Sequence, residues 1–381
     1  MIKTLFIHAG SHKTGTTSIQ KFLKDNVNDL EVNEGLCVPS LKGMLKLTPD
    51  LKDYGLFPNA FHELRFLNCD KAVISRENFS WVRSKPKLIK LKSVLDKYAV
   101  NTKVVFYIRR QDSLAISQKQ EGTKWLDCSI AYGHEPKALP SNLSDSAENY
   151  LNYYGRISLW ADIFGDENIV VRIFDKKTLE NNDVVCDFCS VIGVDFKRYP
   201  LPNKINESLS RSSQLFLHQT RDVFKEGTKE KHRLVKSIRR IDKNLPNHKL
   251  LPSRKEAQIF YERFKEQNKL LNDRFSISDI PSIFHEDFSM YPISEDAEGL
   301  SQSELNSIYK LVIDDLVNEK PNVSELNDVQ LSMVLKQIAI SFTRKSLSEA
   351  IKLLEVASFL NPKGFYIKKK LFEYKSLLNK D

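Results

Sequence analysis

Short apolar runs alternate with helical periodicities through the first half of the chain. The apolar runs, which predict buried strands, cover residues 2–7, 72–75, 103–108 and 168–173. The helical patterns between them cover residues 16–27, 87–97, 111–124 and 146–164, the last ending at Gly165 as a C-cap. Strands that alternate with helices favour the α/β class, with a parallel central sheet flanked by helices.

Beyond residue 200 the pattern is helical. Ser253 and Glu256 have the spacing of a capping box, which predicts a helix reaching about Asn272. Residues 289–305 turn acidic and linker-like, so we divide the chain into an α/β domain, 1–290, and a helical C-terminal module, 291–381. Helices are expected near residues 326–343, 346–360 and 363–379.

Residues 347–362 resemble one tetratricopeptide repeat unit. Such units need neighbours to bury their faces. The sequence therefore leaves two interpretations open: a repeat-like module that binds a partner protein, or a helical hairpin that packs on the main domain.

Composition fits a folded protein that attracts anions. The chain has 381 residues, of which 41% are hydrophobic and 28% charged, with a net charge of +9. The excess of positive charge indicates either a lysine-rich surface or attraction for anionic ligands. Because no nucleic-acid-binding motif accompanies the charge, we do not expect nucleic acid as a partner.

Five cysteines, an odd and sparse number, predict a reducing compartment. Cys186 and Cys189 form a C-x-x-C pair among apolar residues, which we interpret as a buried helix turn rather than a metal or redox site. The N-terminus reads as a strand, and no apolar stretch approaches 18 residues. We therefore expect a cytoplasmic protein, with peripheral attachment to the inner face of the membrane left open.

The segment 8–18, His-Ala-Gly-Ser-His-Lys-Thr-Gly-Thr-Thr-Ser, carries the strongest chemical signal. Gly10 and Gly15 have the G-x-x-x-x-G spacing of a phosphate-binding P-loop between a strand and a helix. A nucleoside-triphosphatase has lysine directly after the second glycine, where this chain has Thr16 and carries Lys13 earlier. No apolar run ends in an aspartate suited to Mg²⁺. The loop therefore suits a nucleotide whose single 5′-phosphate bears a transferable group.

A second feature follows the strand at 103–108. Arg109 stands at the strand end and Ser117 lies eight residues later, two turns into the next helix. A strand-end arginine and a helix hydroxyl so placed can converge on one anion. Taken alone, the two residues also fit a sheet-edge arginine and an ordinary helix serine.

Together these residues resemble the sulfotransferases that use 3′-phosphoadenosine 5′-phosphosulfate (PAPS). The resemblance spans about residues 1–290, and residues 12–20 are most similar to bacterial members that modify surface polysaccharides. It implies a PAPS-binding loop formed by His12, Lys13, Thr14, Gly15, Thr16, Thr17 and Ser18. It also implies that Arg109 and Ser117 bind the 3′-phosphate. A weaker match is Asn206-Glu-Ser-Leu-Ser210, which also reads as a helix cap.

The implied reaction moves a sulfuryl group to a hydroxyl of a carbohydrate acceptor, with no metal expected. Lys13 would stabilise the leaving phosphate oxygen. Family members carry His or Glu as general base after a central strand, and here Glu77 is the first candidate and His62 the second. Basic residues near these positions would receive an anionic acceptor: Arg65, Arg76, Lys42 and Lys46.

Two other functions compete with this one. The first is a P-loop kinase of small metabolites, which would need Mg²⁺ and a nucleoside triphosphate. The second is a non-catalytic nucleotide-binding or scaffold protein whose C-terminal helices recruit partners. A preference for PAPS over ATP with Mg²⁺ would distinguish a sulfotransferase from the kinase. Catalytic turnover would distinguish it from the scaffold protein.

Overall fold

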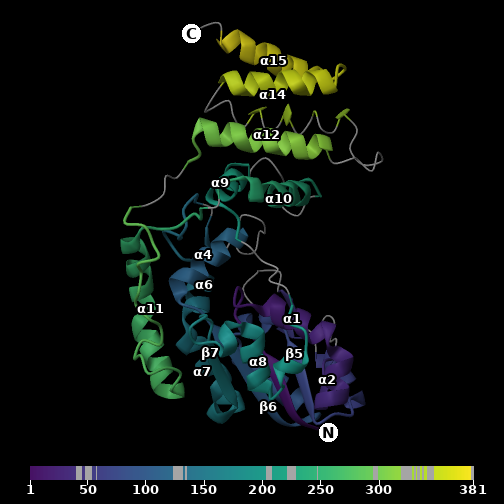
Figure 1. The fold of residues 1–381 in the computed structure, drawn as a ribbon, viewed down its shortest axis with the longest axis vertical. Coiled ribbons are helices and arrows are strands. Elements are labelled where there is room, and N and C mark those ends of the chain that lie inside the picture. Colours follow the sequence, from purple (N-terminus) through teal and green to yellow (C-terminus); the bar gives the residue numbers. More distant parts are fainter. Residues whose placement is uncertain are drawn as a thin grey trace.

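A computed structural model describes most of the chain, and its centre is a five-stranded parallel sheet in the order β2-β5-β1-β6-β7 (Figure 1). The strands are β1 (Ile2–His8), β2 (Leu36–Cys37), β5 (Lys71–Ser75), β6 (Ala99–Ile108) and β7 (Ile169–Ile173). The described residues are 1–39, 45–47, 54–56, 58–122, 132–133, 135–202, 208–220, 229–246, 248–294, 299–318, 347–378 and a few positions between 328 and 340. The predicted parallel α/β fold is confirmed.

Helices cover both faces of this sheet because its strands are apolar on both sides. Phe6 packs with α1 (Thr16–Asp25), α2 (Val27–Glu34) and α8 (Val184–Ile192). Its neighbours Leu5 and Ile7 face the opposite cluster, as the alternation of a strand requires. That cluster includes side chains of α3 (Lys85–Leu95), α4 (Gln111–Gly122), α6 (Asp145–Leu151), α7 (Tyr153–Phe164) and α11 (Arg254–Phe275).

The strand order gathers three chain segments at one edge of the sheet. After β5 the chain crosses to the other side of β1 and forms β6. The amide of Ala9 donates to the carbonyl of Val105 at 3.0 Å, and the amide of Arg76 donates to that of His8 at 3.1 Å. The loops after β1, β5 and β6 therefore meet where the topology of the sheet switches, which is where open α/β sheets bind ligands.

Two helices end earlier than the apolar periodicity predicts. The helix expected over 146–164 is divided at Asn152, whose side chain accepts from the amide of Gly155 at 2.9 Å and begins α7. Likewise α1 stops at Asp25, because the side chain of Asn26 donates to the carbonyl of Phe22 and α2 follows. Gly165 ends α7 as predicted.

The remaining helices stack beyond the sheet (Figure 1). They are α9 (Arg211–Gln219), α10 (Lys229–Ile241), α12 (Gln302–Asn318), α14 (Leu347–Leu360) and α15 (Phe365–Leu378). One hydrophobic cluster joins buried side chains from all five, so α9 and α10 pack with the C-terminal helices. By contrast, α11 packs on α4 and α7, the helices that cover one face of the sheet. The proposed division at residue 290 stays a prediction, as do the repeat-like interpretation and its protein partner.

Several local predictions for this region are confirmed. The Ser253–Glu256 capping box is present and opens α11. The helices expected at 346–360 and 363–379 correspond to the hairpin of α14 and α15. Most of the helix expected at 326–343 lies outside the described residues.

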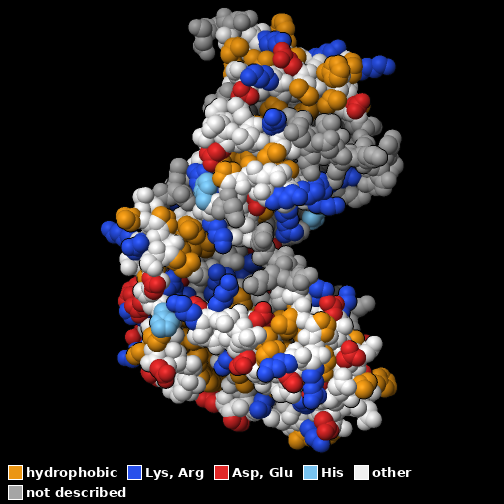
Figure 2. Space-filling model, viewed as in Figure 1, with side chains coloured by type: hydrophobic (Ala, Val, Ile, Leu, Met, Phe, Trp, Pro, Cys, Tyr) orange, Lys and Arg blue, Asp and Glu red, His pale blue; other side chains and the backbone are white. Residues whose placement is uncertain are grey.

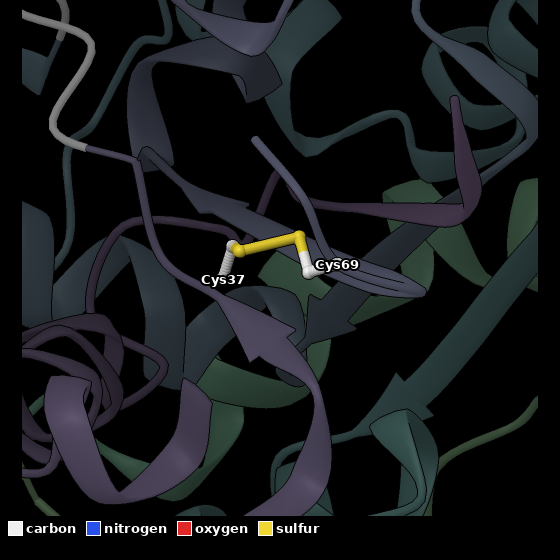
Figure 3. Close-up of a disulfide and its surroundings, with 2 residues drawn as sticks. All are labelled: Cys37 and Cys69. Carbon is white, nitrogen blue, oxygen red and sulfur yellow. A yellow bond between two sulfur atoms is a disulfide. The ribbon is translucent and has the colours of Figure 1, made fainter. Parts of the chain in front are cut away.

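A disulfide joins Cys37, at the end of β2, to Cys69, just before β5 (Figure 3). The odd, sparse cysteine count from which a reducing compartment is predicted therefore includes one disulfide-bonded pair. Cys186 and Cys189 are buried free thiols on α8, which confirms the buried helix turn. Within the described ranges no helix has both the length and the apolar character that crossing a bilayer requires. The cytoplasmic and membrane-face locations stay predictions.

Candidate functional site

The loop between β1 and α1 is a tight turn with three left-handed residues. Gly10, Lys13 and Gly15 have φ angles of 53°, 65° and 76°. Inside the turn, the hydroxyl of Thr14 donates to the carbonyl of Ser11 at 2.6 Å. No side chain caps the N-terminus of α1, and its first turn holds no acidic residue. Its free amides and helix dipole therefore favour an anion at the loop.

Gly15 is required by both conformation and space. A Cβ there would lie 2.6 Å from Cγ1 of Val184 and 3.1 Å from the ring of Phe174, both of which belong to the layer behind the loop. We expect Gly15→Ala to lower the free energy of unfolding by about 2–4 kcal/mol, from backbone strain plus overpacking. Urea unfolding measures the change.

Gly35→Ala is the matched control for this prediction. Gly35 also has a positive φ, +60°, but a Cβ there would meet nothing within 4 Å. Gly35→Ala should therefore lower the free energy of unfolding only by the backbone strain, about 1–2 kcal/mol. Equal losses in the two variants would contradict the close packing assigned to Gly15.

His8 lies buried directly beneath the loop. Its Nδ1 is 2.7 Å from Oγ of Ser75, while Nε2 has no partner among the described residues. Nε2 is 3.3 Å from the point where a Cβ on Gly10 would stand. Burial lowers the pKa of His8 to about 3, so the imidazole is neutral at physiological pH. His8 thus presents an unpartnered ring nitrogen toward the loop.

This burial predicts a pH dependence of stability. An unfolded histidine takes up a proton near pH 6.5, whereas folded His8 does so only near pH 3. Between these values the unfolded state binds the extra proton, so stability falls as pH falls, by up to about 1.4 kcal/mol per pH unit from this group. Urea unfolding at pH 7, 5.5 and 4.5 should show a shallower loss in His8→Asn than in the unaltered protein. Parallel pH curves would contradict the prediction.

Lys13 reaches from the loop to α4. Its Nζ lies 3.2 Å from Oε2 of Glu121. The half-buried positions of α4 are spaced three and four residues apart, so they share one helix face: Ser113, Ser117, Gln120 and Glu121. Ser117 therefore lies one turn from the carboxylate that contacts Lys13, on the same face of α4.

Arg109 extends the same surface from the end of β6. Its Nη1 is 3.5 Å from the carbonyl oxygen of Lys13. Burial lowers the pKa of Arg109, and within the described part of the chain no carboxylate forms an ion pair with it. By contrast, the neighbouring Arg110 pairs with Asp112 at 2.8 Å. The positive charge of Arg109 is thus available to an anion beside the loop.

Glu77 and His12 meet on the other side of the loop. Glu77 begins the 3₁₀ helix η2 (Glu77–Trp81), and its Oε1 lies 3.7 Å from Nε2 of His12. Trp81 donates from Nε1 to Nδ1 of His12 at 3.2 Å, which assigns the imidazole proton to Nε2, facing Glu77. Burial lowers the pKa of His12, and the charge of Glu77 partly opposes this. His12 is therefore a neutral donor directed at a carboxylate.

For the other predicted residues, the structure shows no side-chain contact with the loop within the described part of the chain. His62 and Arg65 are exposed in η1 (Pro58–Phe66), and the guanidinium of Arg65 lies 4.4 Å from the centre of the Phe66 ring. Arg76 is exposed beside Glu77 but forms no ion pair with it in the described part of the chain. Lys42 and Asn206 lie outside the described residues, as does the side chain of Lys46. Roles for these residues stay predictions.

Four residues at the site were not expected from sequence: Trp81, Glu121, Tyr150 and Arg156. The hydroxyl of Tyr150 accepts from the amide of His12 at 2.9 Å, and its ring stacks on Trp81 with centroids 4.1 Å apart. Arg156 offered one sequence signal, since it is the basic residue within the largely apolar helix α7.

The molecule is hollowed between the sheet part and α10, and Lys and Arg side chains gather on α10 above the hollow (Figure 2). Lys236 and Arg239 are exposed residues of α10. A positively charged surface of this kind raises the local concentration of anionic ligands. Among the described residues, no group of three or more His, Cys, Asp or Glu side chains is arranged to hold a metal ion.

Comparison with known proteins gives distant relationships. No family model matches the chain. An uncharacterised protein of Archaeoglobus fulgidus is 26% identical over 199 residues, so the match spans about half of this chain and 50% of the length of that relative. The crystal structure of a sulfotransferase from Alicyclobacillus acidocaldarius aligns with 73% of this chain and 98% of its own, at 12% identity and a TM-score of 0.38. These values do not establish a family for the chain.

Proposed function

We propose that this protein transfers a sulfuryl group from PAPS to a hydroxyl of a carbohydrate, with a bacterial surface glycan as the acceptor class. One observation carries the proposal: the guanidinium of Arg109 lies 3.5 Å from the carbonyl of Lys13. This contact brings together the two motifs that resemble the PAPS-binding motifs of sulfotransferases. A lysine at the tip of the loop, rather than after its second glycine, also suits a phosphosulfate better than a triphosphate.

The residues present fit the donor. A Cβ on Gly10 would fill space beside Nε2 of His8 and Oγ1 of Thr16, so the glycine leaves room for a phosphate to approach the backbone. The 5′-phosphosulfate would accept hydrogen bonds from the amides of residues 14–17 and from the hydroxyls of Thr17 and Ser18 at the uncapped end of α1, while the hydroxyls of Thr14 and Thr16 hold the turn through the carbonyl of Ser11. Arg109 and Ser117 would hold the 3′-phosphate.

Transfer is an in-line displacement at sulfur. The acceptor oxygen forms a bond to sulfur, the bond from sulfur to the 5′-phosphate oxygen breaks, and its electron pair stays on that oxygen. Lys13 and the N-terminus of α1 stabilise the charge that develops there. Glu77 takes the proton of the acceptor hydroxyl, and the Nε2–H of His12 orients the carboxylate. The products are a sulfate ester and adenosine 3′,5′-bisphosphate.

An anionic acceptor is the form of the substrate that the charge distribution favours. Exposed Arg65 and Arg76 precede Glu77 along the chain, and α10 adds exposed basic side chains above the hollow. These charges would hold acidic groups of a glycan while one of its hydroxyls reaches Glu77.

The test is turnover of PAPS with neutral cello-oligosaccharides and with acidic uronate-containing oligosaccharides. We expect a sulfated product and one adenosine 3′,5′-bisphosphate per transfer, and Arg65→Ala with Arg76→Ala should slow the acidic substrates more. Equal slowing of both classes would reject the anionic acceptor. Phosphorylation with ATP and Mg²⁺ would favour the kinase, and bisphosphate binding without turnover on either class would favour the scaffold.

A further inference from the structure

Arg156 is a buried cation whose polar contacts in the described part of the chain are with neutral groups. It lies on α7 with 3% of its surface exposed, and within the described residues no Asp or Glu forms an ion pair with it. Its Nη2 donates to Oγ of Ser11 at 3.0 Å and its Nη1 to the carbonyl of Ser80 at 3.4 Å. Nε has no partner in that part of the chain.

Neutral groups compensate this charge only in part. The guanidinium carbon lies 4.5 Å from the ring centre of Tyr150 and 5.2 Å from that of Tyr153, so both rings contribute cation–π attraction. A buried charge is normally neutralised by an opposite one, because removing it from water is costly. The charge also acts on the site, since Arg156 lowers the pKa of His12, although less than burial does.

The contacts of Arg156 connect the two halves of the site. Ser11 belongs to the loop, and Ser80 belongs to η2, the turn that carries Glu77. The hydroxyl of Tyr150 spans the same gap, because it accepts from the amide of His12 and lies 3.1 Å from Oγ of Ser80. Arg156 and Tyr150 together fix the loop relative to Glu77.

We infer that Arg156 is a positioning residue whose missing countercharge is the anionic group bound at the loop. It does not touch the donor; it holds Ser11 and η2 in place and attracts the phosphosulfate through the loop. The inference rests on the proposed function, since that function identifies the anion as the sulfated 5′-phosphate of PAPS.

This role predicts opposite effects on stability and on binding. Arg156→Met removes the buried charge and keeps most of the volume, so the ligand-free protein should unfold at the same temperature or higher. Its affinity for adenosine 3′,5′-bisphosphate should fall by about tenfold or more, because the attraction acts across a poorly solvated region. Arg156→Lys keeps the charge without the forked contacts, so it should recover part of the affinity.

The experiment measures thermal unfolding and calorimetric affinity for adenosine 3′,5′-bisphosphate in Arg156→Met, Arg156→Lys and the control Arg83→Met. The guanidinium of Arg83 lies 5.6 Å from the Trp81 ring and donates to Ser146, so it touches the same aromatic cluster, and its contacts among the described residues do not include the loop. We expect unchanged affinity in the control.

The inference is overturned if Arg156→Met keeps its affinity within twofold, or if it unfolds earlier than the unaltered protein or fails to fold. Failure of the proposed function would give a different result, because the unaltered protein itself would not bind the bisphosphate and would bind ATP with Mg²⁺. In that case the same variants, titrated with ATP and Mg²⁺, must show the same loss and partial recovery for the inference to stand.

Discussion

Lys13→Ala is expected to lower the rate of sulfuryl transfer by about 10²–10³-fold, the usual effect of removing one preorganised group that stabilises a leaving oxygen. Lys13 lies in the loop with φ 65°, and its ammonium contacts Glu121 on α4. Alanine has the same steric cost as lysine at a positive φ, so the substitution adds no backbone strain and the protein should still fold. Single-turnover rates with PAPS and an acidic oligosaccharide measure the loss.

Two companion variants sharpen this prediction. Lys13→Arg keeps the positive charge and should retain more activity than Lys13→Ala. Glu121→Gln removes the carboxylate that contacts Lys13 in the ligand-free protein. The donor then no longer has to break the ion pair between Lys13 and Glu121 in order to bind. Affinity for adenosine 3′,5′-bisphosphate should then rise by a few-fold, the value of one partly exposed ion pair. A rate in Lys13→Ala within a few-fold of normal would remove Lys13 from the mechanism.

Glu77→Gln is expected to lower kcat by about 10²–10⁴-fold while leaving nucleotide affinity unchanged, because it removes the proton acceptor but not the loop. Glutamine is nearly the same size as glutamate and keeps a polar oxygen toward Nε2 of His12, so the local arrangement should survive. The measurement is kcat as a function of pH at saturating donor.

His62→Gln is the matched comparison for Glu77. His62 is exposed in η1, and within the described residues its side chain makes no contact with the loop. Its replacement should change kcat by less than about threefold, and it should leave the shape of the pH profile intact. A larger loss in His62→Gln than in Glu77→Gln would transfer the role of general base to the histidine.

Local sequence patterns predicted the parts of the site that depend on short-range order. The strand at 2–7, the glycine spacing and the strand before Arg109 are each fixed by a few adjacent residues, and β1, the loop and β6 follow them. Glu77 became a candidate through the resemblance, because family members carry His or Glu after a central strand, and it stands two residues after β5. Parallel topology then implies that these strand ends share one edge.

The rest of the site depends on contacts between distant segments. Glu121 is an ordinary helix carboxylate until the loop places Lys13 against it, 108 residues earlier in the sequence. The link from Arg156 to Ser11 spans 145 residues, and no local periodicity encodes it. The disulfide between Cys37 and Cys69 likewise depends on β2 lying beside β5.

Calorimetry with adenosine 3′,5′-bisphosphate, compared with ATP and Mg²⁺, tests the central claim most directly. At one edge of the sheet the guanidinium of Arg109 lies 3.5 Å from the backbone carbonyl of Lys13, so both positive side chains belong to the same site. The bisphosphate should therefore bind tightly with a metal chelator present, and more tightly than ATP. The Lys13→Ala/Arg109→Ala double variant should lose that binding while it stays folded. Absence of binding in the unaltered protein, or equal binding in the double variant, would contradict the assignment of this loop to a phosphosulfate donor.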